Sequence, residues 1–174
     1  MLVNLTDIFM SQGKKTEMQV VQDIKIFNNG IEEFAIKDIS PLTLVLTNVE
    51  PQRALVSGNI QVNVTVNCDR CLKELDKILE IEFTREVVSP EIKDEDLMED
   101  QMVFMEGYQL NIENLISNEI LMNWPTKVLC REDCKGICNV CGMDLNAGNC
   151  QCDTFVPDPR MAKIKDIFNA NKEV

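Results

Sequence analysis

Hydrophobic and polar residues alternate most regularly over residues 60–67, where aliphatic side chains occupy every second position. This period of two is typical of a strand with one buried and one solvated face. A second strand is predicted over residues 73–87, in which apolar side chains also recur at alternate positions. The sequence CDRC at 68–71 separates the two segments. The simplest arrangement is therefore an antiparallel hairpin with a Cys-x-x-Cys pair at its tip.

Two more strands are predicted before this hairpin. Residues 18–27 have the composition of a strand, and Asn28-Asn29-Gly30 supplies a turn after them. Residues 42–49 lie between two prolines, which are excluded from the interior of a sheet and so mark the ends of a strand. Residues 5–11 are interpreted as a short helix or an irregular lead-in.

Helical spacing of apolar residues appears after residue 110. Asn111 can cap a helix over 111–123, in which Ile112, Leu115, Ile116 and Ile120 recur on one face. We interpret this stripe as core. Pro125 prevents the helix from continuing. Asp158-Pro159 resembles the start of a terminal helix.

These elements predict an α+β fold with an antiparallel β-sheet core, a few helices and a C-terminal, cysteine-rich segment like a zinc ribbon. The predicted domains are a β-rich core over 1–125 and a cysteine-rich, zinc-binding segment with the terminal helix over 126–174. The core would include an acidic loop at 91–100, EIKDEDLMED, which is either a solvated loop or an arm for a basic partner.

Charge and the N-terminus restrict the class of protein. The net charge of −12 favours basic partners and disfavours broad, non-specific binding to nucleic acid. The N-terminus lacks the basic start and long apolar stretch of a secretory signal. No apolar run approaches the length of a membrane span, about 20 residues. We therefore expect a cytoplasmic protein without a membrane partner, in which thiols stay reduced.

Cysteine is the residue that carries the candidate chemistry, because the chain has eight cysteines and no histidine. Disulfides are disfavoured in the cytoplasm. A thioredoxin-type pair needs a Cys-x-x-Cys at the start of a helix after a strand, and neither pair here has that setting. Eight thiols make two four-thiolate metal sites. Zinc is favoured over an iron–sulfur cluster because the spacing matches neither common ferredoxin pattern, but a cluster also accepts four thiolates.

The eight cysteines can be divided between two sites in more than one way. Proximity in the chain favours one ribbon-like site from Cys138, Cys141, Cys150 and Cys152. The other site would then consist of Cys68, Cys71, Cys130 and Cys134. The alternative joins the two Cys-x-x-Cys pairs and leaves Cys130, Cys134, Cys150 and Cys152 together.

Sites with four protein thiolates have no open position for water, so two structural zinc ions and no catalytic residue are predicted. The chain also has no histidine to act as a general base. Basic residues near the cysteines would neutralise the thiolate centres or contact RNA or another partner; they are Arg70, Lys127, Arg131 and Lys135.

The order of these motifs resembles the bacterial YceD family, which is linked to accumulation of large-subunit ribosomal RNA. The resemblance rests on CDRCL at 68–72, WPTKVLCREDCKGICNVCGMDLN at 124–146, CQC at 150–152 and DPR at 158–160. Family members commonly have Leu and Pro where this chain has Ile137 and Asn139.

The resemblance implies a role in ribosome biogenesis that is carried out by binding, with no enzymatic activity and no small-molecule substrate. The acidic charge favours a basic large-subunit ribosomal protein over the rRNA itself as the direct contact. The alternative is a thiol-based redox or zinc-responsive regulatory protein, whose cysteines would be the working residues.

Overall fold

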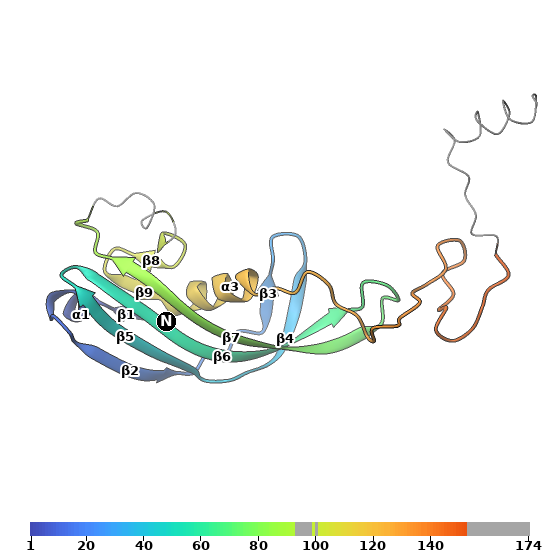
Figure 1. Cartoon of the computed structure of the whole chain (residues 1–174), viewed down its shortest axis with the longest axis horizontal. Coiled ribbons are helices and arrows are strands. Elements are labelled where there is room, and N and C mark those ends of the chain that lie inside the picture. The colour runs from blue at the N-terminus through green and yellow to red at the C-terminus, as the bar shows by residue number, and fades with distance from the viewer. Residues whose placement is uncertain (93–98, 100, 153–174) are drawn as a thin grey trace, which may run out of the picture. The chain divides into compact units, whose positions relative to one another are not determined.

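The computed structural model describes residues 1–92, 99 and 101–152, which form two compact units (Figure 1). The first unit comprises Met1–Asn67 and Glu74–Val128. The second comprises Cys68–Lys73 and the chain from Leu129 onward. The tip of the predicted hairpin thus belongs to the cysteine-rich unit.

A six-stranded antiparallel sheet forms the body of the first unit. Its centre is the hairpin of β6 (Arg53–Asn67) and β7 (Glu74–Val88), two strands of 15 residues that pair without a register shift. On its other side β6 pairs first with β5 and then with β4. The remaining strands are β2 (Lys15–Val20), β3 (Ile26–Asn28), β4 (Glu33–Ile39) and β5 (Leu42–Glu50).

Among the described residues, a smaller sheet and the helices α1 and α3 complete this unit. The small sheet has the order β1 (Leu2–Asn4), β9 (Gln109–Asn111), β8 (Met105–Glu106). Helix α1 (Thr6–Met10) follows β1, and α3 (Ile112–Met122) follows β9. The Asn111 side chain accepts a hydrogen bond from the backbone N–H of Asn114 at 3.3 Å, so it caps α3 as predicted. Figure 1 shows α3 lying along one face of the large sheet.

The core lies between α3 and the facing side of the large sheet. On β6 the even-numbered residues from Ala54 to Val66 face inward and are buried. Leu115, Ile116 and Ile120 of α3 are fully buried in the same cluster. The buried faces of β6 and α3 therefore pack into a single core, which is why the alternation of β6 and the helical spacing of α3 are so regular in the sequence.

The structure confirms the α+β class, the hairpin, the strand at 42–49 and the capped helix. The prediction of one strand over 18–27 is wrong, because β2 ends at Val20 and β3 begins at Ile26. Val20 pairs with Leu42, the first residue of β5, and Pro41 before it cannot donate to a ladder. The strand β4 was not predicted. Its pairing with β6 is interrupted by a bulge between Ile36 and Asp38 that disturbs the alternation.

Two predicted features lie outside the described residues: most of the acidic run at 91–100, and the terminal helix beginning at Asp158. Across the part of the chain that is described, no helix is long and apolar enough to cross a membrane.

Gly58 lies where β6 is packed tightly against its neighbours. It pairs with Phe83, and a Cβ there would lie 2.8 Å from the Phe83 ring and 2.9 Å from the Thr43 carbonyl oxygen. We expect Gly58→Ala to lower the free energy of unfolding by about 1–3 kcal/mol, because backbone and ring cannot both move away. Urea unfolding measures this loss. Gly148→Ala is the control, since its nearest contact is the flexible end of Met143 at 3.3 Å, and it should be close to neutral.

Candidate metal centres

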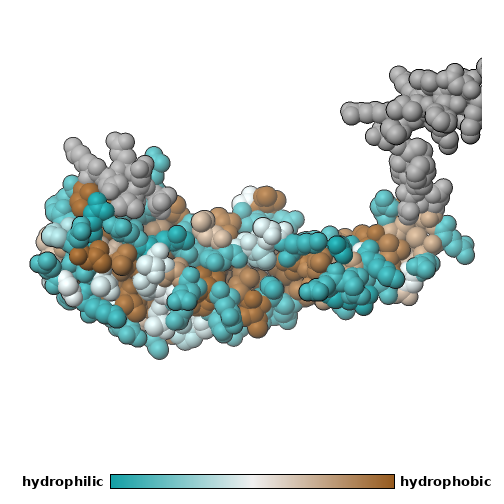
Figure 2. All heavy atoms as spheres, viewed as in Figure 1, coloured by the Kyte–Doolittle hydropathy of each residue, from teal (hydrophilic) through white to brown (hydrophobic). Residues whose placement is uncertain are grey.

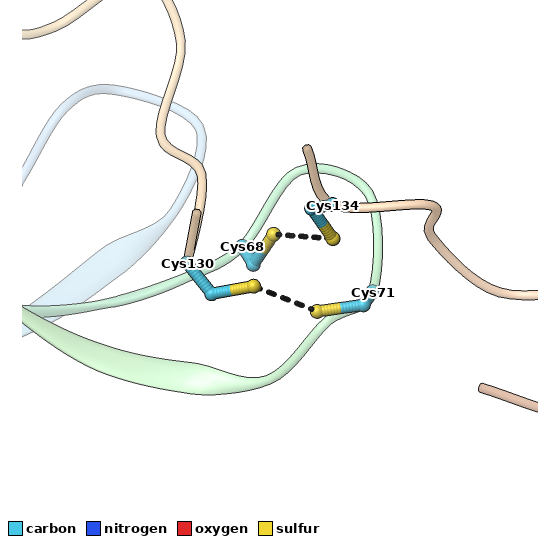
Figure 3. A group of neighbouring side chains, drawn as sticks. All are labelled: Cys68, Cys71, Cys130 and Cys134. Atoms are coloured by element: carbon cyan, nitrogen blue, oxygen red, sulfur yellow. Dashed lines mark hydrogen bonds between the residues drawn. The ribbon is translucent and has the colours of Figure 1, made fainter. Parts of the chain in front are cut away.

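Four cysteines converge at the tip of the β6–β7 hairpin. Cys68 and Cys71 come from the tip itself, and Cys130 and Cys134 come from the segment that follows α3 (Figure 3). The Cys68 and Cys134 sulfurs are 3.8 Å apart, and the Cys71 and Cys130 sulfurs are 3.6 Å apart. All four sulfurs lie within 4.8 Å of one another. We call these residues the hairpin set.

These distances fit a single ion bound by four thiolates. Four sulfurs at about 2.3 Å from one tetrahedral ion are separated by about 3.8 Å along the edges of the tetrahedron. The two sulfur–sulfur separations, 3.6 and 3.8 Å, match that edge. A disulfide would need a sulfur–sulfur distance of about 2.05 Å. An iron–sulfur cluster places several atoms among its thiolates and spreads them further, so a mononuclear ion is the better fit.

A second group of four cysteines, the ribbon set, lies in the chain beyond Cys134. It consists of Cys138, Cys141, Cys150 and Cys152, whose sulfurs also lie within 4.8 Å of one another. The structure therefore brings the eight thiols together in the two groups that proximity in the sequence favours. Both groups could hold a metal ion. The alternative division, with the two Cys-x-x-Cys pairs in one site, is not the arrangement that these residues adopt.

The two Cys-x-x-Cys pairs use the same turn. The carbonyl of Cys68 accepts from the N–H of Leu72 at 2.9 Å, and that of Cys138 accepts from Gly142 at 2.8 Å. The residue after the second cysteine has a positive φ in both turns, 60° for Leu72 and 73° for Gly142. Glycine adopts this conformation without a steric penalty, so Gly142 suits this turn. Leu72 adopts it at a steric cost.

Three residues support the hairpin set through contacts that the sequence did not predict: Arg70, Asn146 and Gly136. The Arg70 guanidinium donates to the Cys134 carbonyl at 2.7 Å. The Asn146 side-chain N–H points at the Cys134 sulfur at 3.5 Å, and its oxygen accepts from the Lys135 N–H at 2.8 Å. Gly136 has a φ of 80°. Their signal in the sequence was only their position inside the motifs at 68–72 and 124–146, because each acts through a contact that its own motif does not reveal.

Gly136 lies against the turn that carries Cys68 and Cys71. A Cβ on Gly136 would lie 2.9 Å from the Arg70 carbonyl oxygen, which accepts a hydrogen bond from the Ile137 N–H at 3.1 Å. We expect Gly136→Ala to weaken metal binding by the hairpin set, because it pushes this turn away and also forces alanine to a positive φ. Gly142→Ala is the matched control, since it has the same backbone strain, about 1–2 kcal/mol, but nothing within 4 Å of its Cβ.

Competition with a metal chelator, followed by elemental analysis, measures this effect. Gly136→Ala should lose metal from the hairpin set at a lower chelator concentration than Gly142→Ala loses it from the ribbon set. Equal behaviour of the two variants would mean that the contact with Arg70 has no influence on the site.

The protonation of the thiols explains why a cation is needed to complete each set. Burial raises the pKa of Cys68, but backbone N–H groups of Cys71, Cys130 and Arg70 stabilise the thiolate and bring the pKa to about 6. The N–H groups of Cys141 and Val140 lower the pKa of Cys138 to about 6.

One further thiol of each set resists ionisation strongly. Burial and the neighbouring sulfurs raise the pKa of Cys130 to about 12. The Cys141 sulfur and burial raise the pKa of Cys152 to about 12. Without a cation, Cys68 and Cys138 lose their protons readily, whereas Cys130 and Cys152 keep theirs. Metal binding must therefore release protons, and it weakens as the pH falls through about 6, where Cys68 and Cys138 become protonated too.

The four basic residues predicted as RNA or partner contacts differ in their surroundings. Arg70 is bound to the Cys134 carbonyl, and Arg131 donates to Asn146 at 2.9 Å and pairs with Asp133 at 3.3 Å. Both arginines are thus engaged in holding the cysteine-rich unit together. Lys127 and Lys135 are exposed.

Fold and site together define a class: a protein with two separate groups of four cysteines that could each hold a metal ion, one of them assembled at the tip of a long antiparallel hairpin. Residues 56–168 match the sequence model of the family described as "Large ribosomal RNA subunit accumulation protein YceD". The chain belongs to this family.

Relatives with similar sequences come from mycobacteria. The "Uncharacterized protein Rv2926c" of Mycobacterium tuberculosis and the "Uncharacterized protein Mb2951c" of Mycobacterium bovis are each 26% identical over 147 residues. The match covers 83% of this chain and 70% of either relative. No solved structure matches the chain.

Proposed function

We propose that this protein is a non-enzymatic factor that supports accumulation of large-subunit ribosomal RNA and ribosome biogenesis, stabilised by two structural zinc ions. The observation that carries the proposal is the geometry of the two cysteine sets in a member of the YceD family. In each set the four sulfurs lie within 4.8 Å of one another, so four thiolates would close the coordination sphere of one ion. A catalytic zinc keeps one position open for water or substrate, and here protein sulfur would fill every position.

Zinc is the metal that we assign to both sets. It prefers four ligands in a tetrahedron and accepts thiolate alone. The backbone N–H groups that lower the pKa of Cys68 and Cys138 would also reduce the charge that the four thiolates carry.

The direct partner in this proposal is a basic large-subunit ribosomal protein, with the rRNA as the alternative contact. The net charge of −12 attracts a cationic protein and repels a nucleic acid backbone. Two of the four basic residues near the cysteines, Arg70 and Arg131, are already bound within the chain. This leaves Lys127 and Lys135 as the exposed basic residues for an RNA contact.

The metal content tests the first part of the proposal. Protein purified without chelator should carry close to two zinc ions per chain, one for each set, and should be colourless. Elemental analysis and a visible spectrum check this. One metal per chain would contradict the two-site assignment, and a brown protein would indicate iron.

A cell experiment tests the role in the ribosome. Removal of the protein should lower the ratio of large-subunit to small-subunit rRNA, and the wild-type chain should restore it. A chain with Lys127→Glu and Lys135→Glu should still associate with large-subunit particles if a basic protein is the partner. Loss of association in this variant would identify RNA as the ligand. An unchanged rRNA ratio in cells without the protein would refute the role itself.

A second candidate function is a thiol-based redox or zinc-responsive switch. It is favoured by the exposure of Cys130 and Cys141, one thiol in each set, to solvent. An oxidant could reach both residues, and oxidation would release the metal. Mild peroxide should leave the metal content unchanged if zinc is structural, and reversible release at low peroxide would favour the switch.

A further inference from the structure

The strand β7 lies at the border of the large sheet (Figure 1). It pairs with β6 from Glu74 to Val88, and no strand among the described residues pairs with its other side. A long strand with an unpaired side presents a row of N–H and C=O groups to which another strand can be added.

The side chain of Gln101 shows which backbone groups point outward. Its oxygen accepts from the Val88 N–H at 2.8 Å, and its nitrogen donates to the Val88 carbonyl at 3.1 Å. In an antiparallel strand the outward-pointing groups recur at every second residue. Because β6 and β7 pair without a register shift, the groups of Glu80, Glu82, Thr84 and Glu86 point the same way as those of Val88. The Gln101 amide thus makes the two hydrogen bonds that a neighbouring strand would make to Val88.

The side chains of these same residues give this border a strongly acidic face. Glu80, Glu82 and Glu86 are exposed on the side of the sheet away from the core. Gln61 donates to Glu80 at 3.2 Å and Arg53 pairs with Glu86 at 2.8 Å. Within the described chain, no cationic side chain pairs with Glu82. A strand added here would have every second side chain above this carboxylate row.

The opposite face of the border is partly apolar. A groove of about 350 Å³ runs beside Thr84–Glu86, and its other lining residues are the apolar Val103, Phe104 and Met122 and the polar Glu99 and Asn118. Val103 and Met122 are 55% and 65% exposed, although both are large and apolar. Figure 2 shows apolar atoms exposed over the part of the surface where α3 and β7 lie. Beside Thr84–Glu86, the side chains of an added strand that point away from the carboxylates would enter this groove.

We propose that the β7 border from Glu80 to Glu86 binds an extended protein segment as an antiparallel strand, and that basic and apolar side chains alternate along that segment. The basic side chains lie over Glu80, Glu82 and Glu86, and the apolar ones lie in the groove beside Val103 and Met122. The proposal rests on the proposed function, since it names the surface that receives the basic partner. The carboxylate row repels RNA, and a second copy of β7 would place two carboxylate rows against each other.

Binding of a synthetic peptide to the full-length, metal-loaded protein tests the charge half of the proposal. The probe is an extended peptide in which lysine and valine alternate, about as long as Glu80–Glu86, and fluorescence anisotropy reports its affinity. Glu80→Gln with Glu82→Gln should weaken binding about tenfold or more. The matched control is Glu17→Gln, an exposed glutamate of β2 at the far border of the same sheet, which should bind like the wild type.

Backbone methylation of the peptide tests the strand half. In an antiparallel pair, two residues that exchange backbone hydrogen bonds have their side chains on the same face of the sheet. The peptide residues whose N–H groups bond to Glu80, Glu82 and Glu86 are therefore the lysines. Methylation of the lysine backbone nitrogens should abolish binding, and methylation of the valine nitrogens should leave it intact. Equal binding of both methylated peptides would overturn strand addition. Unchanged affinity of the glutamine variant would overturn the site, and the acidic row would then only protect the border from self-association.

These outcomes are independent of the proposed function. A normal rRNA ratio in cells without the protein would refute that function, while peptide binding with the predicted methylation pattern would still support the border site. Conversely, a lowered rRNA ratio together with failed peptide binding would overturn the border site alone.

Discussion

Cys71→Ser is expected to remove one metal ion per chain and to destabilise the protein more than Cys150→Ser, which is expected to remove the other ion. Each change leaves three thiolates in one set, and serine oxygen is a poor replacement for a thiolate on zinc. Structural zinc contributes about 10 kcal/mol or more of apparent binding free energy in small domains, so loss of either ion should be measurable in urea unfolding.

The metal ions that the two variants lose close loops of different length. Cys71 and Cys130 are 59 positions apart, whereas the ribbon set lies within residues 138–152. Closure of a longer loop removes more conformational freedom from the unfolded chain, so the hairpin set should stabilise the fold more. Each variant serves as the control for the other. If both variants lose both metals and unfold alike, the two sets are not independent sites.

Arg85→Met is expected to lower the free energy of unfolding by about 3 kcal/mol, because it leaves the Glu119 carboxylate buried without its partner. The Arg85 guanidinium donates two hydrogen bonds to Glu119, at 2.6 and 2.9 Å, and joins β7 to α3. The Glu119 side chain is only 1% exposed. Urea unfolding of the single variant measures this loss.

The double variant Arg85→Met with Glu119→Leu should recover most of the lost stability, because it removes the buried charge together with its partner. Lys37→Met is the control. Lys37 and Asp76 form a pair of 2.6 Å on the same sheet, but both side chains are nearly half exposed. Its loss should cost less than about 1 kcal/mol. A double variant no more stable than Arg85→Met would show that the pair stabilises the fold by packing and not by charge compensation.

The sequence predicted the elements whose pattern is local. The hairpin of β6 and β7 follows from alternation on both sides of CDRC, and α3 follows from its apolar spacing and Asn111. The number of cysteines and their spacing also predicted two groups of four thiols. These predictions succeed because strand and helix periods, caps and short ligand spacings depend on neighbours within a few residues.

Other features depend on which distant segments meet, and the sequence did not predict them. The segment 18–27 divides into two strands because β5 begins only at Leu42, and β4 forms because β6 offers it a partner. The contact of Gly136 with Arg70, and that of Asn146 with Cys134, join residues from different parts of the cysteine motifs.

By itself, the sequence determined the α+β class, the central hairpin, the capped helix and a thiol inventory suited to two metal ions. Only the tertiary structure decided the sulfur–sulfur distances, the polar groups that support Cys134, the buried Arg85–Glu119 pair and the border of β7 that no described strand pairs with. The physical reason is that alternation specifies which face of a strand is buried, but it does not specify which strand lies beside it. The border of a sheet, like a site built from distant cysteines, depends on which segments of the chain lie side by side in the fold.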